Sequence, residues 1–500
     1  MSLKEEPASP TARLMQAPSF NLCILALLGY STKIDVNLFK KCLEQTLLKH
    51  PRFSSLLVVN DKKLGKCSWR RTRVDLENHV YVPDLEPDME NPDGFVEDFT
   101  SGLSRIPLDY AKPLWEVHIL NVKTSDANSV VIFKIHHSLG DGVSMISLVL
   151  ACSKKLSDPE SLPVMPSKKQ KQKQAQKQTT CGVVGLMKRL FVAFWMILVV
   201  IFNTLIDSAL FGATILFLKD SKTPIKGGKR VDRAPQRFVH RIVSLDDVKL
   251  VKNAMNVSIN DVVLGVTEAG LTRYLNRTYD SNTAQKHREN GAQVMKKTRA
   301  LPRHLRLRSA VIFNLRPTPS IEDLAEIMEK EKELNGMWGN LVAIVLLPMT
   351  IALQDDPLSY VRRAKATMDR KKLSLESKVV FTGLKLLIKL FGIKTAAAVT
   401  SAVLRNTTFG FSNVAGPQEE ISLFGHPLNY IAPSVHGFPH ALIIHCQTYA
   451  NKLIICLAAD ENLIPNPHQL CDDLQKSLQI IKETVIKRGL VKGSPLCETV

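Results

Sequence analysis

The segment Phe133–Ser144 reads FKIHHSLGDGVS and decides how the rest of the chain is interpreted. Apolar residues run directly into two adjacent histidines, His136 and His137, which predicts a strand that ends at the pair. Because neighbouring side chains of a strand point to opposite faces, only one of the two imidazoles can face a given cavity. Imidazole titrates near neutral pH, so the histidine at the cavity can accept a proton and return it.

The residues after the histidines predict a tight turn. Gly140 and Gly142 suit a sharp change of chain direction, and Asp141 between them can orient the loop or an imidazole within it. A buried, hydrogen-bonded histidine pair in a turn is the non-catalytic interpretation of the same residues. A zinc site is disfavoured, since no further ligands follow at helical or CxxC spacing. The segment therefore predicts either a general base or a structural turn, and no metal.

Outward from this segment, the pattern predicts an α/β fold in two units. The first, residues 1–165, contains a helical pattern over Val36–His50 and strand-like runs over Phe53–Val59, Trp115–Val122 and Val130–Ile135. The second, residues 235–490, alternates strands and helices and ends with an amphipathic helix. Its expected strands are Phe238–Val243, Ser309–Asn314, Leu341–Pro348 and a hairpin of Leu442–Tyr449 with Lys452–Ala458; its expected helices are Leu245–Met255, Val262–Leu275, Tyr360–Lys372, Leu375–Phe391 and Pro467–Lys487.

Residues 166–234 connect the two units and have a different composition. Ser167–Thr180 is a lysine and glutamine tract with no large apolar residue, which predicts a solvated linker. The apolar region 190–218 follows, interrupted by Asp207, and it is the one stretch that we expect to be long enough to enter a bilayer. A buried core helix is the alternative. Lysines on both sides favour a membrane setting.

Composition narrows the possible partners. The chain has 500 residues and a net charge of +19, which favours anionic partners such as a membrane surface or a phosphorylated ligand like CoA. We expect no nucleic-acid binding, because aromatic residues are only 6% and the chain has no RNP motif, zinc finger or basic zipper. Nine cysteines without a CxxC pair indicate a reducing environment rather than a disulfide framework.

Several ordered motifs resemble one protein family. HHSLGDG at 136–142 matches the HHxxxDG motif of the CoA-dependent acyltransferase superfamily, and the chain from about residue 8 to 488 is similar to the plant-type wax ester synthase/diacylglycerol acyltransferase family. The supporting stretches occur in the family's order. They are Ser9-Pro10, His50–Phe53, Pro113–Glu116, Asn260-Asp261, Asn314–Pro317, Trp338–Asn340 and Ser412–Pro417.

The resemblance implies a fold and a reaction. The fold would be two chloramphenicol-acetyltransferase-like lobes, each a mixed sheet flanked by helices, with a tunnel between them and the apolar segment in the connection. The second histidine of the family motif is the base, which maps to His137; His136 would support it and Asp141 would be structural. Fatty acyl-CoA would be a co-substrate, no cofactor would be bound, and the acceptors would be long-chain alcohols or diacylglycerol.

A thioester needs only a base and a stabiliser for the tetrahedral oxyanion, so no covalent nucleophile is expected. Ser412 or Asn413, at the end of a strand-like run, are candidates for the oxyanion donor; a plain strand and turn is the alternative. Gly142 is a further candidate in the turn. Asn260 and Asp261 border the expected tunnel or only cap a helix. A basic run at Arg299, Arg303, Arg306 and Arg308 steers CoA phosphates or is a solvated loop.

Three other protein classes share parts of this pattern. A soluble BAHD-type acyltransferase shares HxxxD but carries a DFGWG motif, which this chain lacks. A peptide-synthetase condensation domain shares HHxxxDG but normally adjoins a carrier domain. A catalytically inactive, membrane-anchored binding protein is the non-enzymatic alternative, and the intact HHSLGDG argues against it.

The order of the motifs constrains how the chain meets a membrane. His137 precedes the apolar region whereas Asn260 and Ser412 follow it, so one complete span would separate the two halves of the site. Asp207 would also be costly at the bilayer centre. We therefore expect a re-entrant hairpin or an in-plane helix bent near Asn203–Ser208, on the endoplasmic reticulum with both lobes in the cytosol; the plasma membrane is the other candidate.

Overall fold

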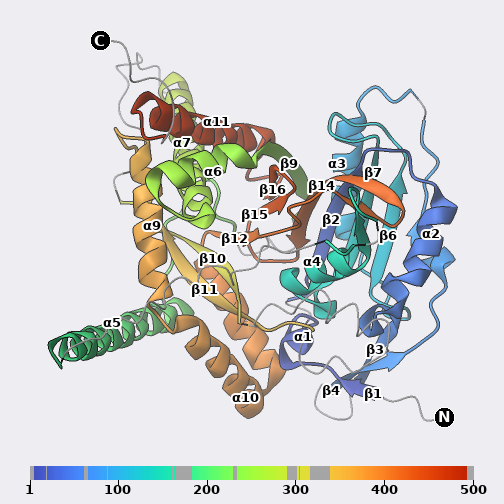
Figure 1. The fold of residues 1–500 in the computed structure, drawn as a ribbon, viewed down its shortest axis with the longest axis horizontal. Helices are drawn as coiled ribbons and strands as arrows, with labels where there is room; N and C mark the ends of the chain where they lie inside the picture. Colours follow the sequence, from blue (N-terminus) through green and yellow to red (C-terminus); the bar gives the residue numbers. More distant parts are fainter. Residues whose placement is uncertain are drawn as a thin grey trace.

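The computed structural model describes residues 5–17, 20–60, 66–86, 88–159, 161–163, 183–228, 234–289, 301–302, 304–315 and 338–491. The lysine and glutamine tract, Arg299 and Arg303 lie outside these residues. Figure 1 shows two α/β lobes side by side, with one long helix projecting from the body. The two-lobed α/β architecture expected from the sequence is confirmed.

The first lobe is built on a seven-stranded sheet. Its strand order is β5 (Val80–Tyr81), β6 (Trp115–Leu120), β7 (Ser129–His136), β2 (Cys23–Tyr30), β14 (His426–His436), β13 (Ile421–Leu423) and β8 (Ser153–Lys155). The lobe also contains the helices α1 (Pro10–Leu14), α2 (Val36–Gln45), α3 (Pro92–Arg105) and α4 (Gly142–Ala151), and a small sheet of β1 (Glu5–Pro7), β4 (Lys66–Arg71) and β3 (Ser55–Asn60). Two of the seven strands, β13 and β14, come from the C-terminal half of the chain.

The second lobe is built on a six-stranded sheet. Its strand order is β11 (Val342–Met349), β10 (Leu307–Asn314), β12 (Phe409–Val414), β15 (Leu442–Tyr449), β16 (Lys452–Asp460) and β9 (Gln236–Ser244). Pairing is parallel between β10, β12 and β15 and antiparallel elsewhere, so the sheet is mixed, as expected. The expected hairpin is confirmed as β15–β16, turning at Ala450, whose φ is +47°.

One face of the second sheet is covered by the lobe's own helices, α6 (Leu245–Met255), α7 (Ile259–Glu289), α9 (Leu358–Lys372) and α11 (Pro467–Lys487). Residues of β15 alternate between two cores, because successive side chains point to opposite faces. Ile444 and Cys446 pack in the core under these helices, whereas Ile443 packs in the core that fills the first lobe. The second sheet therefore lies between its helices and the first lobe.

The connection is one continuous helix, α5 (Val183–Leu216), of 34 residues and therefore about 51 Å. The expected bend near Asn203–Ser208 is wrong, because this region is bonded to the turn between α9 and the next helix, α10 (Glu376–Asn406). Asn203 Nδ2 donates to Leu373 O at 3.1 Å, and Asp207 forms ion pairs with Arg370 at 2.7 Å and Lys371 at 3.0 Å. These partners offset the cost of burying Asp207, so the helix does not need to break there.

The expectation of a single long apolar stretch is also wrong. A second helix, α10 (Glu376–Asn406), is long and apolar enough to cross a membrane by length and composition, as is α5. The sequence analysis ended this helix at Phe391. The backbone continues through a break at Gly392, whose φ is +80°, and the segment after the break is buried at Ala396, Ala397 and Leu404.

Candidate active site

The predicted histidine turn lies at the end of β7. His136 is the last residue of the strand, and His137 begins a short 3-10 helix, His137–Leu139. The backbone N–H of His137 donates to Leu22 O at 2.8 Å. Both imidazoles are buried, with 1% and 4% of their residue surface exposed. The turn then enters α4, which begins at Gly142.

The ring of His136 is held at both nitrogens. Nδ1 accepts from the Ser138 backbone N–H at 3.2 Å and lies 2.7 Å from Ser138 Oγ, so the ring proton is on Nε2, which donates to Asn21 Oδ1 at 2.7 Å. Burial, together with the neighbouring His137, lowers the pKa of His136 to about 3. A neutral imidazole with both nitrogens engaged suits a supporting residue.

Asp141 accepts two backbone hydrogen bonds from different parts of the chain. Its Oδ1 accepts from Ser144 N–H at 2.9 Å, which caps the N-terminus of α4, and its Oδ2 accepts from Leu341 N–H at 3.2 Å. The second bond joins the turn to the segment that precedes β11. These contacts support a structural role for Asp141.

The segment Trp338–Asn340 of the second lobe forms hydrogen bonds to the histidine turn. Trp338 Nε1 donates to Leu139 O at 2.6 Å, and Asn340 Nδ2 donates to His137 O at 2.8 Å. Gly339 has a φ of +112°, which favours glycine, and a Cβ on Gly140 would lie 3.1 Å from the Trp338 ring. In the sequence this segment was only a marker of the family, and its contacts with the turn were not predicted.

His137 has a ring nitrogen without a partner in the described part of the chain. Its Nδ1 is buried and has no hydrogen-bond partner among the described residues. Burial lowers the pKa of His137 below 6.5, while its own backbone, Asp141 and Asn340 oppose that shift. The imidazole is therefore neutral at neutral pH, the form that accepts a proton.

Two strands of the second lobe place their side chains on the side of the first lobe. In the β12–β15 pair, Ser412 lies opposite His445 and Asn413 lies opposite Cys446. Since Cys446 packs under the helices, the alternation places Ser412 and His445 on the other face, toward the first lobe. Val414, two residues after Ser412, lies 3.6 Å from the position of a Cβ on Gly142. The end of β12 therefore meets the start of α4.

Asn413 and Asn260, two predicted site residues, face away from this junction. Asn413 Nδ2 donates to Asn260 Oδ1 at 2.5 Å on the helical side of the sheet. Asp261 forms a reciprocal cap with Ser258, because its Oδ2 accepts from Ser258 N–H at 2.8 Å and its own N–H donates to Ser258 Oγ at 3.2 Å. Of the tentative oxyanion and tunnel residues, Gly142 lies in the histidine turn and Ser412 lies on the sheet face toward the first lobe. Asn260 and Asp261 lie at the start of α7, and Asn413 is bonded to Asn260.

His445 is a residue that the sequence analysis missed. Its Nδ1 is buried without a hydrogen-bond partner among the described residues. Burial lowers the pKa of His445 to about 4, and His137 is near enough to contribute to that shift. The alternation of the β15 hairpin could have placed His445 on the face opposite Cys446, but only the packing of the lobes brings it toward His137.

Arg308, the last arginine of the predicted basic run, lies in β10 and is not available to a ligand. That guanidinium is buried, forms an ion pair with Asp220 at 2.7 Å and donates to Thr214 Oγ1. A buried, paired arginine cannot attract a solvated phosphate, so the interpretation of Arg308 as a CoA-steering residue is wrong. Among the described residues, no group of three or more histidine, cysteine or acidic side chains is arranged to hold a metal ion.

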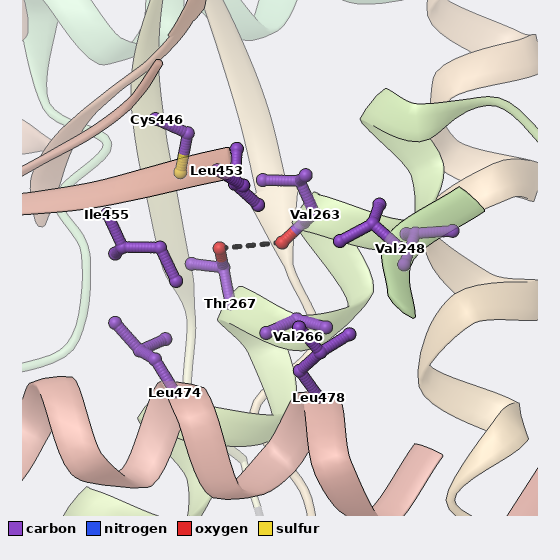
Figure 2. Close-up of a pocket in the computed structure, with 10 residues that line it drawn as sticks. Val248, Val263, Val266, Thr267, Cys446, Leu453, Ile455, Leu474 and Leu478 are labelled. Carbon is purple, nitrogen blue, oxygen red and sulfur yellow. Dashed lines mark hydrogen bonds between the residues drawn. The ribbon is translucent and has the colours of Figure 1, made fainter. Parts of the chain in front are cut away.

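A small cavity lies on the helical side of the second sheet (Figure 2). Its volume is about 10 Å³, and its lining is apolar apart from Thr267, which donates to Val263 O at 2.8 Å. Leu474 and Leu478 of α11 close it from one side, and Cys446 of β15 closes it from another. The space is at the lower limit for one water molecule and cannot hold a substrate, so it is a packing gap.

Comparison with known proteins agrees with this geometry. Residues 17–263 match the model of the wax ester synthase/diacylglycerol acyltransferase catalytic domain, and residues 338–482 match the WS/DGAT C-terminal domain. Wax ester synthase/diacylglycerol acyltransferase 11 of Arabidopsis thaliana is 50% identical over 98% of this chain and 97% of its own length. Wax ester synthase/diacylglycerol acyltransferase 4 of the same plant is 45% identical over 97% of this chain and 91% of its own length.

Solved structures show the same fold at low identity. The wax ester synthase/diacylglycerol acyltransferase from Marinobacter aquaeolei VT8 aligns with a TM-score of 0.55 and 17% identity, covering 96% of this chain and 99% of that one. The first condensation domain of the CDA synthetase aligns with a TM-score of 0.52 and 13% identity, covering 93% of this chain and 91% of that domain. With two matching domain models and full-length relatives, the chain belongs to the wax ester synthase/diacylglycerol acyltransferase family.

Proposed function

We propose that this protein transfers a fatty acyl group from acyl-CoA to the hydroxyl of a long-chain alcohol or of diacylglycerol, with His137 as the general base. The observation that carries the proposal is the neutral His137 imidazole at the junction of the lobes, with an unpartnered ring nitrogen. The names of the relatives supply the class of product, which is a wax ester or a triacylglycerol.

The reaction needs one proton to move twice. His137 takes the proton of the acceptor hydroxyl as its oxygen attacks the thioester carbonyl, and a tetrahedral oxyanion forms. Ser412, on the facing sheet, is the candidate donor to that oxyanion. When the intermediate collapses, the carbon–sulfur bond breaks and His137 returns the proton to the CoA thiolate. General base catalysis contributes about 10²–10⁴-fold in such reactions.

The rest of the turn positions the base. His136 fixes the end of β7 through Asn21, and Asp141 and Asn340 hold the backbone on either side of the His137 ring. No metal or bound cofactor has a part in the proposed steps, because the thioester is already activated. A Cβ on Gly142 would be in ordinary contact with Val414, so the start of α4 packs closely against β12.

The catalytic assignment is tested with purified protein, labelled acyl-CoA and a long-chain alcohol. We expect His137→Ala to lower ester formation at least about 10²-fold with an unchanged melting temperature. His136→Ala is the matched control and should act mainly through stability, since its ring bonds to Asn21 and Ser138. Equal activity of folded His137→Ala and wild type would reject the base.

The class of product is tested in a host that makes no neutral lipid. New wax ester or triacylglycerol on thin-layer plates is the expected result. Absence of both, from a protein that still binds acyl-CoA, would favour the catalytically inactive binding protein instead.

We further propose that the protein is attached to the endoplasmic reticulum through α5, with both lobes in the cytosol; the plasma membrane is the second candidate. Residues 186–198 of α5 are exposed on every side and almost wholly apolar, with Phe191 67% and Trp195 57% exposed. A helix that is apolar all round is stable only in a protein interior or in lipid. Membrane lipids are therefore the expected surroundings of this half of α5.

Chain connectivity supports an in-plane orientation for α5. Strands from both sides of α5 pair in one sheet, since β14 pairs with β2, so both ends of the helix must lie on the side of the lobes. If the free half crossed the bilayer, the chain between Pro163 and Val183 would have to return through it with its lysine tract, at a cost of about 2.5–3.5 kcal/mol for each charge at the bilayer centre. An in-plane helix avoids that cost.

The orientation is tested with protease-accessible tags placed within 167–180 and after Lys222, in sealed microsomes. We expect the protease to digest both tags. Protection of one tag with digestion of the other would establish a complete span. A variant with Phe191→Gln, Trp195→Gln and Leu198→Gln should release the protein from membranes, and it leaves the docked region around Asp207 intact.

A further inference from the structure

The break at Gly392 divides α10 into two helices with opposite surroundings. After the break, Ala396, Ala397 and Leu404 are at most 1% exposed and belong to the core. Before it, the segment Glu376–Phe391 presents large apolar side chains to solvent. Its length of about 24 Å is short of a hydrocarbon core of about 30 Å, and it carries three lysines, so it is not a span.

The exposed apolar residues of this segment form one stripe. Val379, Leu386 and Leu390 are 45%, 54% and 62% exposed, and their spacing of seven and four residues places them on one face of the helix. Phe391, 66% exposed, follows Leu390 by one position and therefore lies about 100° around the helix from it, beside the stripe and just before the break. The exposed Gly383 continues the face between Val379 and Leu386 without a side chain.

A row of lysines runs beside the stripe. Lys378, Lys385 and Lys389 each precede a stripe residue by one position, so they lie about 100° around the helix from it, along one edge of the apolar face. All three are exposed, and none forms an ion pair with an acidic side chain among the described residues. The acidic residue of the segment, Glu376, is buried and pairs with Lys371 at 2.6 Å. The charged side chains that Glu376–Phe391 exposes are therefore all cationic.

The stripe continues the surface that α5 offers. α5 packs against α10, and the two are joined where Leu375 N–H donates to Thr204 Oγ1 at 2.9 Å. In Figure 1 the two helices diverge near the lower end of α9, with α5 projecting to the left and α10 running downward. Lys188 and Arg189 add exposed cations near the free end of α5.

We propose that Glu376–Phe391 is a second membrane contact, an amphipathic helix that lies in the lipid interface and selects anionic phospholipid. Its apolar stripe enters the acyl boundary and its lysine row meets the headgroup phosphates and carboxylates. The proposal rests on membrane attachment through α5 and adds a charge-selective surface to it. With two helices in the interface, the body can no longer rotate about α5, so the lobes keep one orientation to the lipid from which apolar acceptors come.

The test is flotation of the purified full-length protein with vesicles of phosphatidylcholine alone or of phosphatidylcholine with phosphatidylserine. We expect tighter binding to the anionic vesicles, falling as salt rises. The variant Lys378→Gln/Lys385→Gln/Lys389→Gln should bind them about 10²-fold more weakly, at roughly fivefold for each lysine. Its binding to neutral vesicles should be unchanged, because α5 is intact.

The matched control is Lys252→Gln/Lys476→Gln/Lys487→Gln, which removes the same charge from α6 and α11. It should bind both kinds of vesicle like wild type. A second variant, Leu386→Gln/Leu390→Gln/Phe391→Gln, should weaken binding to both. These side chains are exposed, so neither variant of α10 should change the melting temperature.

Three results would overturn the proposal. They are equal binding of wild type to both kinds of vesicle, equal loss in the α6/α11 control, and a wild-type dimer in solution that the Leu390 and Phe391 substitutions dissociate. Activity on a short, soluble alcohol separates this proposal from the catalytic one. The lysine variant should retain it, whereas failure of the His137 assignment would leave vesicle binding untouched.

Discussion

Two buried aspartates, Asp141 and Asp207, show how differently the same side chain is stabilised in two regions of this molecule. Asp141, 2% exposed, accepts backbone N–H groups of Ser144 and Leu341. Asp207, 1% exposed, is paired with the side chains of Arg370 and Lys371. In both cases the partners include residues of the C-terminal half, so both depend on tertiary structure.

The kind of partner decides what each aspartate controls. Backbone donors have fixed directions, so Asp141 sets the geometry of the His137 turn. Long cationic side chains tolerate movement, so Asp207 holds α5 against the α9–α10 turn without fixing the precise geometry of the contact. Substitutions at the turn should therefore change turnover, and substitutions at α5 should change stability and membrane binding.

The largest effect is expected from Ser412, which faces the turn. If it donates to the oxyanion, Ser412→Ala should lower kcat about 10²–10³-fold with little change in KM. Asn413→Ala is the matched control, one residue along the strand and on the opposite face, and should cost less than about tenfold. Equal losses in steady-state kinetics at the two positions would contradict the assignment of faces.

The next effect is at Asp207. Asp207→Ala leaves Arg370 and Lys371 without that partner and should lower the free energy of unfolding by about 2 kcal/mol, less than a fully buried pair because Arg370 is partly exposed. Asp356→Ala is the control at a partly exposed site, where each pair with the exposed Arg362 and Arg488 should contribute less than about 1 kcal/mol. Chemical denaturation measures both. A large loss of kcat in folded Asp207→Ala would show that the attachment of α5 also affects turnover, and would contradict the distinction between the two regions.

A smaller effect is expected at Asp141. Asp141→Asn keeps the shape of the side chain but replaces one acceptor oxygen by an NH₂ group that faces a backbone N–H. The substitution should lower the free energy of unfolding by about 1–2 kcal/mol. Turnover should fall about tenfold through the loosened turn. Asp35→Asn is the control, because Asp35 caps α2 in the same way, far from the turn, and should leave kcat unchanged. A melting curve unchanged by Asp141→Asn, with turnover abolished, would assign Asp141 a direct part in catalysis.

The smallest effect is a shift of the pH profile. A general base works in its neutral form, so activity is lost as pH falls through its pKa. Burial lowers the pKa of His137 below 6.5, and the acid limb of kcat should therefore have its midpoint below pH 6.5. Kinetics in buffers of constant ionic strength measure it. A midpoint above pH 6.5 would contradict a buried, neutral His137.

Local patterns predicted the elements with strong periodicity. The amphipathic α11, the helix α6 and the hairpin β15–β16 follow from the order of apolar residues within each segment. The strand β7 and the turn after it were predicted from HHSLGDG in the same way. Of the seven strands of the first sheet, β6 and β7 were predicted and the other five were not. The two longest of the missed strands, β2 and β14, pair with each other across the chain, so the partner that buries each apolar run is distant in the sequence.

The sequence by itself determined the family, the two α/β units and the pair of histidines, because these depend on residue types and short-range period. Only the tertiary structure decided which side chains meet. It placed Ser412 and His445 on the face toward His137 and turned Asn413 away, and it closed the turn with Trp338 and Asn340. It also kept α5 straight through Asp207, because the compensating charges come from α9, more than 160 residues later in the chain. The energy of such contacts depends on residues that are distant in the sequence, so no local pattern predicts them.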